Sequence, residues 1–285
     1  MESGLKGKTV LLTGASGGIG SEIAKAFADE GANLVLTYFK GRKGIEKLKG
    51  ELEAQHSEAK GCDESEELKQ NKGRTLYISV NLTSEADVDK MFKEADNSFG
   101  RIDVLVACAG AWSDPKYIAD RTLEEWETAF KLNSTACFLL ARGFFRNLRK
   151  YPEDNASIVF IGSTAGDLGE AQHHDYAATK SAITVGLLHS LKVEIIDFAK
   201  FGRVNAVNPG WTATAMTRGL LDDRQFVNTI TSTIPLRKVA TTKDVANAVL
   251  FLSSDLLAGD ITGEVLTIAG GMRDRLYHGE LKGDV

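Results

Sequence analysis

The chain has 285 residues, of which 43% are hydrophobic and 26% charged, and its net charge is -5. This length is sufficient for one large α/β domain, and the composition is that of an ordinary globular protein. The negative charge gives no electrostatic attraction for nucleic acid or an anionic membrane surface, so we expect neither as a partner.

The cysteines and the amino-terminal stretch indicate the cellular compartment. Cys62, Cys108 and Cys137 lie far apart and form no CxxC pair, so a zinc site or a disulfide framework is not expected. The stretch MESGLKGKTVLLTG has no apolar signal core, and no apolar run approaches the ~20 residues of a membrane-spanning helix. We expect a cytoplasmic protein without a bound metal.

Short apolar runs alternate with longer helical segments along the chain. The first strand is expected over residues 8–14, and the first helix follows it, with Ile23, Ala26 and Phe27 at helical spacing. Long helices are expected within 122–148 and 176–200. Further strands are expected at 32–38, 74–80, 101–110, 156–163, 202–210 and 263–271. This alternation predicts a single Rossmann-like α/β domain over 1–285, with a doubly wound parallel sheet of about seven strands and helices on both faces.

Two segments depart from this alternation. Residues 50–72 are polar and acidic and predict an exposed helical insertion between the second and third strands. Residues 211–240 are rich in threonine and flanked by Pro209 and Pro235, which is typical of a lid over a substrate site.

A glycine-rich loop joins the first strand to the first helix. In TGASGGIG, residues 13–20, small side chains allow the backbone to approach a pyrophosphate, and free N–H groups at a helix N-terminus bind its charge. The spacing differs from GxGxxG, and a tight turn without a ligand is the alternative. Its position between first strand and first helix favours a dinucleotide site. The candidate cofactor residues here are Gly14, Ser16, Gly17, Gly18, Ile19 and Gly20.

The end of the second strand predicts which dinucleotide is preferred. An acid there would accept from the ribose hydroxyls of NAD and repel a 2′-phosphate. The stretch LTYFKGRKG has no acid between Thr37 and Gly44 but carries Lys40, Arg42 and Lys43. We therefore expect NADP to be preferred, with NAD possible and with Tyr38 and Lys40 at the cofactor. A solvated basic loop is the alternative.

Tyr176 and Lys180 are four residues apart, so they share one face of a helix. A tyrosine is a poor acid–base catalyst near neutral pH unless a cation stabilises its phenolate, and a lysine one turn away supplies that cation. A hydroxyl that holds the substrate oxygen is expected at the carboxyl end of a strand. Ser163, at the end of SIVFIGS, occupies that position.

These motifs together resemble the short-chain dehydrogenase/reductase family over nearly the whole chain. The resemblance rests on TGASGGIG, IGS, YAATK, RVNAVNPGWTAT and FKLNST. It implies that Tyr176 is the general acid/base, that Ser163 orients the carbonyl, and that Asn133 supports a proton-relay water. It also implies that Lys180 holds the nicotinamide ribose and stabilises the tyrosinate.

The resemblance adds cofactor contacts and shows two departures. The family's Asn-Asn-Ala-Gly after the fourth strand is here Ala107-Cys108-Ala109-Gly110, which questions a local network of the sheet and suggests a small buried hydrophobe at Cys108. The family's adenine-contacting aspartate is here Asn81, which can still bond the adenine edge. The implied cofactor residues, besides those above, are Asn81, Leu82, Ala109, Gly110, Tyr176, Lys180, Pro209, Gly210, Thr212 and Thr214.

The expected activity is an NAD(P)-dependent interconversion of a secondary alcohol and a carbonyl by hydride transfer. A 3-oxoacyl-thioester or ketone reductase competes with a sugar or polyol dehydrogenase, such as an aldose 1-dehydrogenase. A dinucleotide-binding sensor without catalysis is the remote alternative, since such proteins tend to lose the tyrosine or the lysine. The candidate substrate residues are Trp112, Gln172, His173 and Trp211; His174 and Asp175 are expected to be structural or exposed.

The resemblance also implies a homotetramer, or a homodimer, formed through long helices and the last strand. The stretches ARGFFRNL and AITVGLLHSL carry apolar residues suited to such packing, although these could equally belong to the core. The tail over 272–285 is longer than the family's usual end. Our hypothesis is that it crosses to a neighbouring subunit near that subunit's active site.

Overall fold

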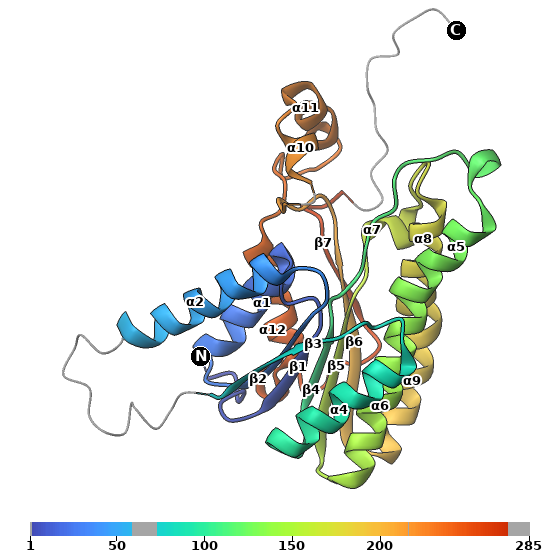
Figure 1. The fold of residues 1–285 in the computed structure, drawn as a ribbon. Helices are drawn as coiled ribbons and strands as arrows, with labels where there is room; N and C mark the ends of the chain where they lie inside the picture. The colour runs from blue at the N-terminus through green and yellow to red at the C-terminus, as the bar shows by residue number, and fades with distance from the viewer. Residues whose placement is uncertain (1, 59–72, 216, 273–285) are drawn as a thin grey trace, which may run out of the picture.

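The computed structural model describes residues 2–58, 73–215 and 217–272, and these fold around one seven-stranded parallel sheet (Figure 1). The strand order is β3-β2-β1-β4-β5-β6-β7, which confirms the predicted doubly wound sheet. In the register, Leu11 pairs with both Val35 and Leu105. The strands are β1 (Thr9–Leu12), β2 (Asn33–Tyr38), β3 (Thr75–Ser79), β4 (Val104–Ala107), β5 (Asn155–Ile161), β6 (Phe201–Pro209) and β7 (Val265–Ile268).

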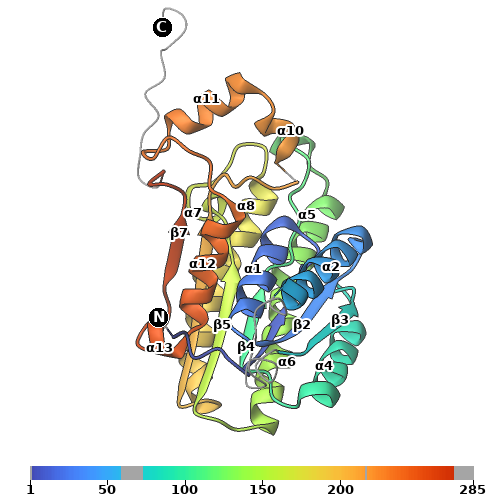
Figure 2. The ribbon, with the colours of Figure 1, turned by 90° about the vertical axis from the view of Figure 1, so that its left-hand side faces the viewer.

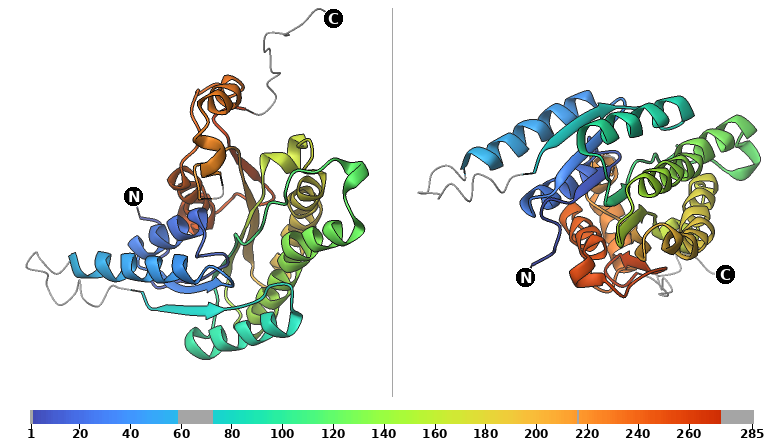
Figure 3. Two further views of the ribbon diagram at one scale, coloured as in Figure 1. Left: turned by 45° about the horizontal axis from the view of Figure 1, so that its top comes forward. Right: turned by 90° about the horizontal axis from the view of Figure 1, so that it is seen from below.

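The sheet separates two hydrophobic cores, because its central strands are apolar on both faces. One core lies under α1 (Gly18–Asp29), α2 (Arg42–Glu58) and α12 (Thr242–Ser253). The other lies under α4 (Glu85–Phe99), α6 (Ala136–Lys150) and α9 (Leu188–Glu194). The two helical layers are visible on either side of the strands in Figure 3. The prediction of helices on both faces is therefore confirmed.

The two long helical segments each contain a π-helical turn. One segment runs through α5 (Leu123–Phe130), η3 (Lys131–Thr135) and α6. The other runs through α8 (His174–Ser181), η4 (Ala182–Leu187), α9 and η5 (Ile195–Asp197). Such turns are rare and frequently mark functional sites. Here the first contains Asn133, and the second begins directly after α8, which carries Tyr176 and Lys180.

Local capping explains where several helices begin. Thr122 and Thr241 each form a capping box with the acidic residue three positions later, at the start of α5 and α12. Ser84 accepts from the backbone N–H of Asp87 and starts α4. The remaining short helices are η2 (Ile118–Asp120), α7 (Thr164–Leu168), α10 (Arg218–Leu221), α11 (Arg224–Ser232) and α13 (Asp255–Ala258).

The segments that interrupt the alternation of strands and helices differ in how far the structure describes them. Part of the predicted insertion over 50–72 is the end of α2, while residues 59–72 lie outside the described residues, as do residues 273–285 of the tail. Apart from residue 216, the segment 211–240 is described and contains α10 and α11. Figure 2 shows these two helices beyond the carboxyl ends of the strands. Asp223 accepts from the N–H groups of Gln225 and Phe226, which fixes the start of α11.

Candidate active site

A cavity of about 760 Å³ opens at the carboxyl ends of the strands. Its walls come from the segments that follow β1, β2, β3, β4, β5 and β6, together with residues of α8. In open α/β sheets, ligands bind in this crevice, at the point where the strand order reverses. In this sheet β1 lies between β2 and β4, so the cavity lies at the position that the fold class predicts.

The glycine-rich loop forms one end of the cavity. Gly14 has φ +71, a conformation that side chains disfavour, and a Cβ on it would stand 2.9 Å from the Cα of Ala109. A Cβ on Gly20 would collide with the carbonyl oxygen of Gly14, and one on Gly18 would stand 3.3 Å from Cβ of Thr214. The loop therefore requires glycine in order to pack, and it leaves backbone exposed where a pyrophosphate would lie.

Thr13 holds the segment after β4, where the sequence departs from the family pattern. Its buried Oγ1 accepts from the backbone N–H groups of Cys108 and Ala109, both at 3.1 Å. A threonine directly after the neighbouring strand β1 thus stabilises this segment. Cys108 is half-buried and lines the cavity, and burial raises the pKa of its thiol to about 12. It is a small neutral group, although it is more exposed to the cavity than the sequence suggested.

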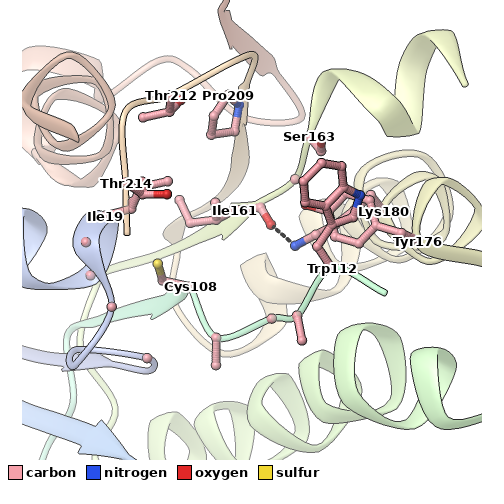
Figure 4. A pocket seen from close by; sticks show the side chains of 18 of the residues that line it. Ile19, Cys108, Trp112, Ile161, Ser163, Tyr176, Lys180, Pro209, Thr212 and Thr214 are labelled. Carbon is pink, nitrogen blue, oxygen red and sulfur yellow. Dashed lines mark hydrogen bonds between the residues drawn. The ribbon is translucent and has the colours of Figure 1, made fainter. Parts of the chain in front are cut away.

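Ser163, Tyr176 and Lys180 all line the cavity, and Figure 4 draws them on its same side. Ser163 is the N-cap of α7, and its Oγ accepts from the N–H of Ala165 at 3.1 Å. The Nζ of buried Lys180 donates to the carbonyl oxygen of Ile161 at 2.7 Å and stands 5.6 Å from the ring centre of Tyr176. The strand end and the first two turns of α8 therefore bring the three side chains to one place.

Asn133 is buried behind this group and does not line the cavity itself. Its Oδ1 accepts from the N–H of Ala111 at 3.0 Å, and its Nδ2 donates to the carbonyl oxygen of Ala111 at 3.1 Å. A Cβ on Gly110 would stand 2.9 Å from Oδ1 of Asn133 and 3.3 Å from Nζ of Lys180. The side chain of Asn133 thus fixes the backbone that passes the lysine.

The edge of the cavity at the end of β2 is basic. Tyr38 and Lys40 line it, and Lys40 extends over the ring of Phe39 with its Nζ 5.8 Å from the ring centre. Arg42 and Lys43 follow as exposed residues in the first turn of α2, which has no acid. On the side of β3, Oδ1 of Asn81 accepts from Thr83.

Aromatic side chains wall the end of the cavity near α8 and α11. Trp112 and Trp211 both line the cavity, with ring centres 6.0 Å apart in an edge-on arrangement. Trp211 also contacts Phe226 of α11 edge-on at 5.2 Å. His173 is buried, with its ring 4.4 Å from that of Trp112. Gln172 has φ +67, and neither it nor His173 lines the cavity. These two candidate substrate residues are therefore not part of the cavity wall, although His173 packs against Trp112, which is.

A buried ion pair lies beneath this aromatic wall. The carboxylate of Asp175 has no exposed surface and lies 3.6 Å from the guanidinium of Arg121, which is 5% exposed. Its Oδ1 accepts from Ser113 Oγ at 2.9 Å and from the N–H of Tyr176 at 2.8 Å. Asp175 is therefore a buried structural residue, which excludes the exposed alternative. It ties the loop after β4 to the start of the helix that carries Tyr176.

All eighteen candidate cofactor residues line this single cavity, together with Ser163, Trp112 and Trp211. Sequence reasoning missed several other lining residues, which carry no motif. Ile161 contributes a backbone carbonyl, which no sequence pattern reveals. The other missed side chains include Leu168, Glu170, Thr217 and Met272.

The described part of the chain contains neither a metal-binding cluster nor a membrane-spanning helix. No group of three His, Cys, Asp or Glu side chains is placed to hold a metal ion there. None of the helices found in residues 2–58, 73–215 and 217–272 combines the length and apolarity that a membrane crossing needs.

Comparison with known proteins places this site among oxidoreductases. A family model described as enoyl-(acyl carrier protein) reductase matches residues 52–273. The 3-oxoacyl-[acyl-carrier-protein] reductase FabG of Aquifex aeolicus is 33% identical over 273 residues, covering 95% of this chain and 100% of the relative. The protein of that name from Escherichia coli is 32% identical over 267 residues, covering 94% and 98%.

Solved structures agree. A short-chain type dehydrogenase/reductase from Mycobacterium ulcerans superposes with a TM-score of 0.83 at 25% identity, covering 95% of this chain and 91% of the other. A structure from Brucella melitensis, titled short-chain dehydrogenase/reductase SDR:Glucose/ribitol dehydrogenase, gives a TM-score of 0.79 at 31% identity, covering 95% and 99%.

The fold, the cavity and these relatives define an NAD(P)-dependent oxidoreductase that acts on CH–OH groups. More particularly, the chain belongs to the short-chain dehydrogenase/reductase family.

Proposed function

We propose that the protein reduces the keto group of a 3-oxoacyl thioester, or of a similar ketone, with NADPH. The observation that carries this proposal is one cavity that joins the glycine loop to Ser163, Tyr176 and Lys180 beside an aromatic wall. The names of relatives that match 94% or more of this chain support the thioester.

The residues present fit a nicotinamide dinucleotide. The glycine loop presents backbone without side chains to the cavity at Gly17 and Gly18, which are exposed and line it. We propose that the eighteen lining residues named above hold the dinucleotide, with Thr212 and Thr214 near the carboxamide and Asn81 near the adenine. When bound, the nicotinamide supplies the hydride.

We propose that Tyr176 is the acid that protonates the substrate oxygen. The hydroxyl oxygen of Ser163 accepts a hydrogen bond from the N–H of Ala165. Its own proton is therefore free to be donated to the carbonyl oxygen of the substrate. Lys180 uses one of its three N–H groups on Ile161, which leaves two for a ribose hydroxyl. Its positive charge also favours the tyrosinate that remains after proton transfer. Asn133 acts by fixing Ala111; a relay water beside it stays a prediction.

We propose that NADP is preferred over NAD. The basic edge at Lys40, Arg42 and Lys43 supports this, because no acid stands between residues 37 and 44 to repel a 2′-phosphate. Lys40→Ala should weaken NADPH binding about five- to tenfold and leave NADH binding within about twofold, because one partly exposed cation contributes about 1 kcal/mol. Exposed Lys47→Ala, in the second turn of α2, is the matched control. An equal loss for both cofactors would contradict the assignment.

The test of the substrate class is a panel of assays on the purified protein. Acetoacetyl thioesters, simple ketones, aldoses and polyols would be compared with NADPH and NADH in both directions. The proposal predicts the highest kcat/KM for a 3-oxoacyl thioester with NADPH. Sugar or polyol oxidation as the fastest reaction would instead favour the second candidate, which the Brucella structure's title and the two tryptophan walls support. Binding without any turnover would favour a sensor.

We further propose a homotetramer or homodimer in the cytoplasm. Apolar side chains stay exposed along the outer faces of the long helices, among them Phe138 (48%), Val185 (56%) and Val193 (63%), which supports packing between subunits. The free thiols of Cys108 and Cys137 support a reducing compartment. Light scattering of the intact protein tests the assembly, and a monomer would contradict it.

We also propose that residues 211–240 are the substrate lid, since Thr214 and Thr217 line the cavity.

A further inference from the structure

Glu170 is the only acidic side chain that lines the cavity among the residues that the structure describes. It lies in the loop that joins α7, whose N-cap is Ser163, to α8, which carries Tyr176. Its carboxylate has no hydrogen bond or ion pair with any described residue. An unpaired acid in a largely apolar wall is costly unless a ligand supplies a donor.

The loop is anchored on both sides of Glu170, so the carboxylate has a fixed origin. The N–H of Gly169 donates to Ala165 at 3.0 Å, and the carbonyl oxygen of Glu170 accepts from the N–H of His173 at 3.1 Å. Two residues further along, the carbonyl oxygen of Gln172 accepts from the N–H of Lys116 at 3.0 Å. Glu170 is half-buried, and this burial alone raises its pKa, so the carboxyl has lost part of its water without gaining a protein donor.

The cations of the cavity do not neutralise this acid. Lys180 donates to Ile161, and Lys40 lies over Phe39 just after the end of β2. Neither forms an ion pair with Glu170, and the two lining residues that precede it in the sequence, Leu168 and Gly169, are uncharged. This end of the cavity therefore offers one negatively charged hydrogen-bond acceptor, the carboxylate of Glu170.

We propose that Glu170 determines substrate specificity by accepting a hydrogen bond from an amide N–H or a hydroxyl of the substrate and by disfavouring substrates that carry a free carboxylate. This inference rests on the proposed reduction of a 3-oxo compound. It identifies the class as neutral 3-oxo compounds with a donor group, which includes amide-bearing thioesters and excludes free 3-oxo acids.

The experiment uses two ligands that differ in one group, acetoacetamide and acetoacetate. The ratio of their kcat/KM values with NADPH is measured for the wild type, Glu170→Gln, Glu170→Leu and the exposed control Glu127→Gln. Two like charges a few ångströms apart at a partly screened site repel strongly. Glu170→Gln should therefore move the ratio about tenfold towards acetoacetate. Glu170→Leu should lower kcat/KM for acetoacetamide by about fivefold because the acceptor is lost.

Glu127→Gln should leave the ratio unchanged. A ratio that moves by less than about twofold in Glu170→Gln would overturn the inference. If the wild type reduces neither compound nor any 3-oxo thioester, the proposed function fails separately. The inference is then decided by the fluorescence of Trp112 and Trp211 when either ligand binds the NADPH complex. Tighter binding of acetoacetamide that disappears in Glu170→Gln supports it, and equal binding of both ligands to the wild type overturns it.

Discussion

Thr13→Val tests the side chain that stabilises the segment after β4. Valine has nearly the shape of threonine but no acceptor, so the N–H groups of Cys108 and Ala109 lose their partner. A buried donor left unsatisfied costs about 1–3 kcal/mol, and both residues are only half-buried. We therefore expect a loss of about 2–4 kcal/mol in the free energy of unfolding. This corresponds to a fall of about 4–8 °C in Tm.

The assay is equilibrium unfolding in urea together with NADPH titration, with Thr13→Ser as the control that keeps the acceptor. The serine variant should lose only about 1 kcal/mol, for one buried methyl group. Because Ala109 and Gly110 line the cavity, the valine variant should also bind NADPH several-fold more weakly. A valine variant within about 0.5 kcal/mol of the wild type would show that the two N–H groups do not depend on Thr13.

Three further changes have defined outcomes. Gly14→Ala, at φ +71 and against Ala109, should weaken NADPH binding at least about tenfold by isothermal titration; unchanged affinity would contradict a close approach there. Asp175→Ala should lower the free energy of unfolding by about 3–5 kcal/mol, since it leaves the buried Arg121 unpaired, and a loss below about 1 kcal/mol would show that the pair is screened. Glu125 accepts hydrogen bonds from Lys116 and from the helix cap Thr122, and these hold its pKa at about 2, below its usual 4.5. The folded pKa is depressed, so this stability is present above pH 4.5 and lost as the pH falls towards 2; Glu125→Gln should flatten that part of the Tm profile, and an unchanged slope would refute it.

The fold could be predicted because its signals are local. Short apolar segments between turns indicated all seven strands, and the central strands β1 and β4 are buried along their whole length, as their continuous apolar runs predict. The helices α10 and α11 were read only as a lid, although Asp223 is an N-cap residue that signals the start of α11. The π-helical turn at Asn133 was not predicted, because its residues were read as part of one continuous helical segment.

The site could be predicted wherever backbone geometry demands a residue type. The glycines of the first loop are such positions, and they all line the cavity; their contact with a cofactor stays a prediction. The role of a side chain whose partner lies far away in the sequence could not be predicted. Asp175 meets Arg121 across 54 positions of sequence only because the loops after β4 and β5 converge. Glu170 looks like any polar loop residue until the cavity shows that it has no partner.

The most direct test of the account is the rate of hydride transfer in Tyr176→Phe. The ring and its contact with Lys180 are kept, and only the hydroxyl is removed. With the exposed Tyr117→Phe as control, we expect kcat to fall by about 10²–10⁴-fold, as for loss of a general acid. The NADPH Kd and the Tm should stay near the wild-type values. A kcat within about tenfold of the wild type, with cofactor binding intact, would contradict the assignment of Tyr176 as the proton donor.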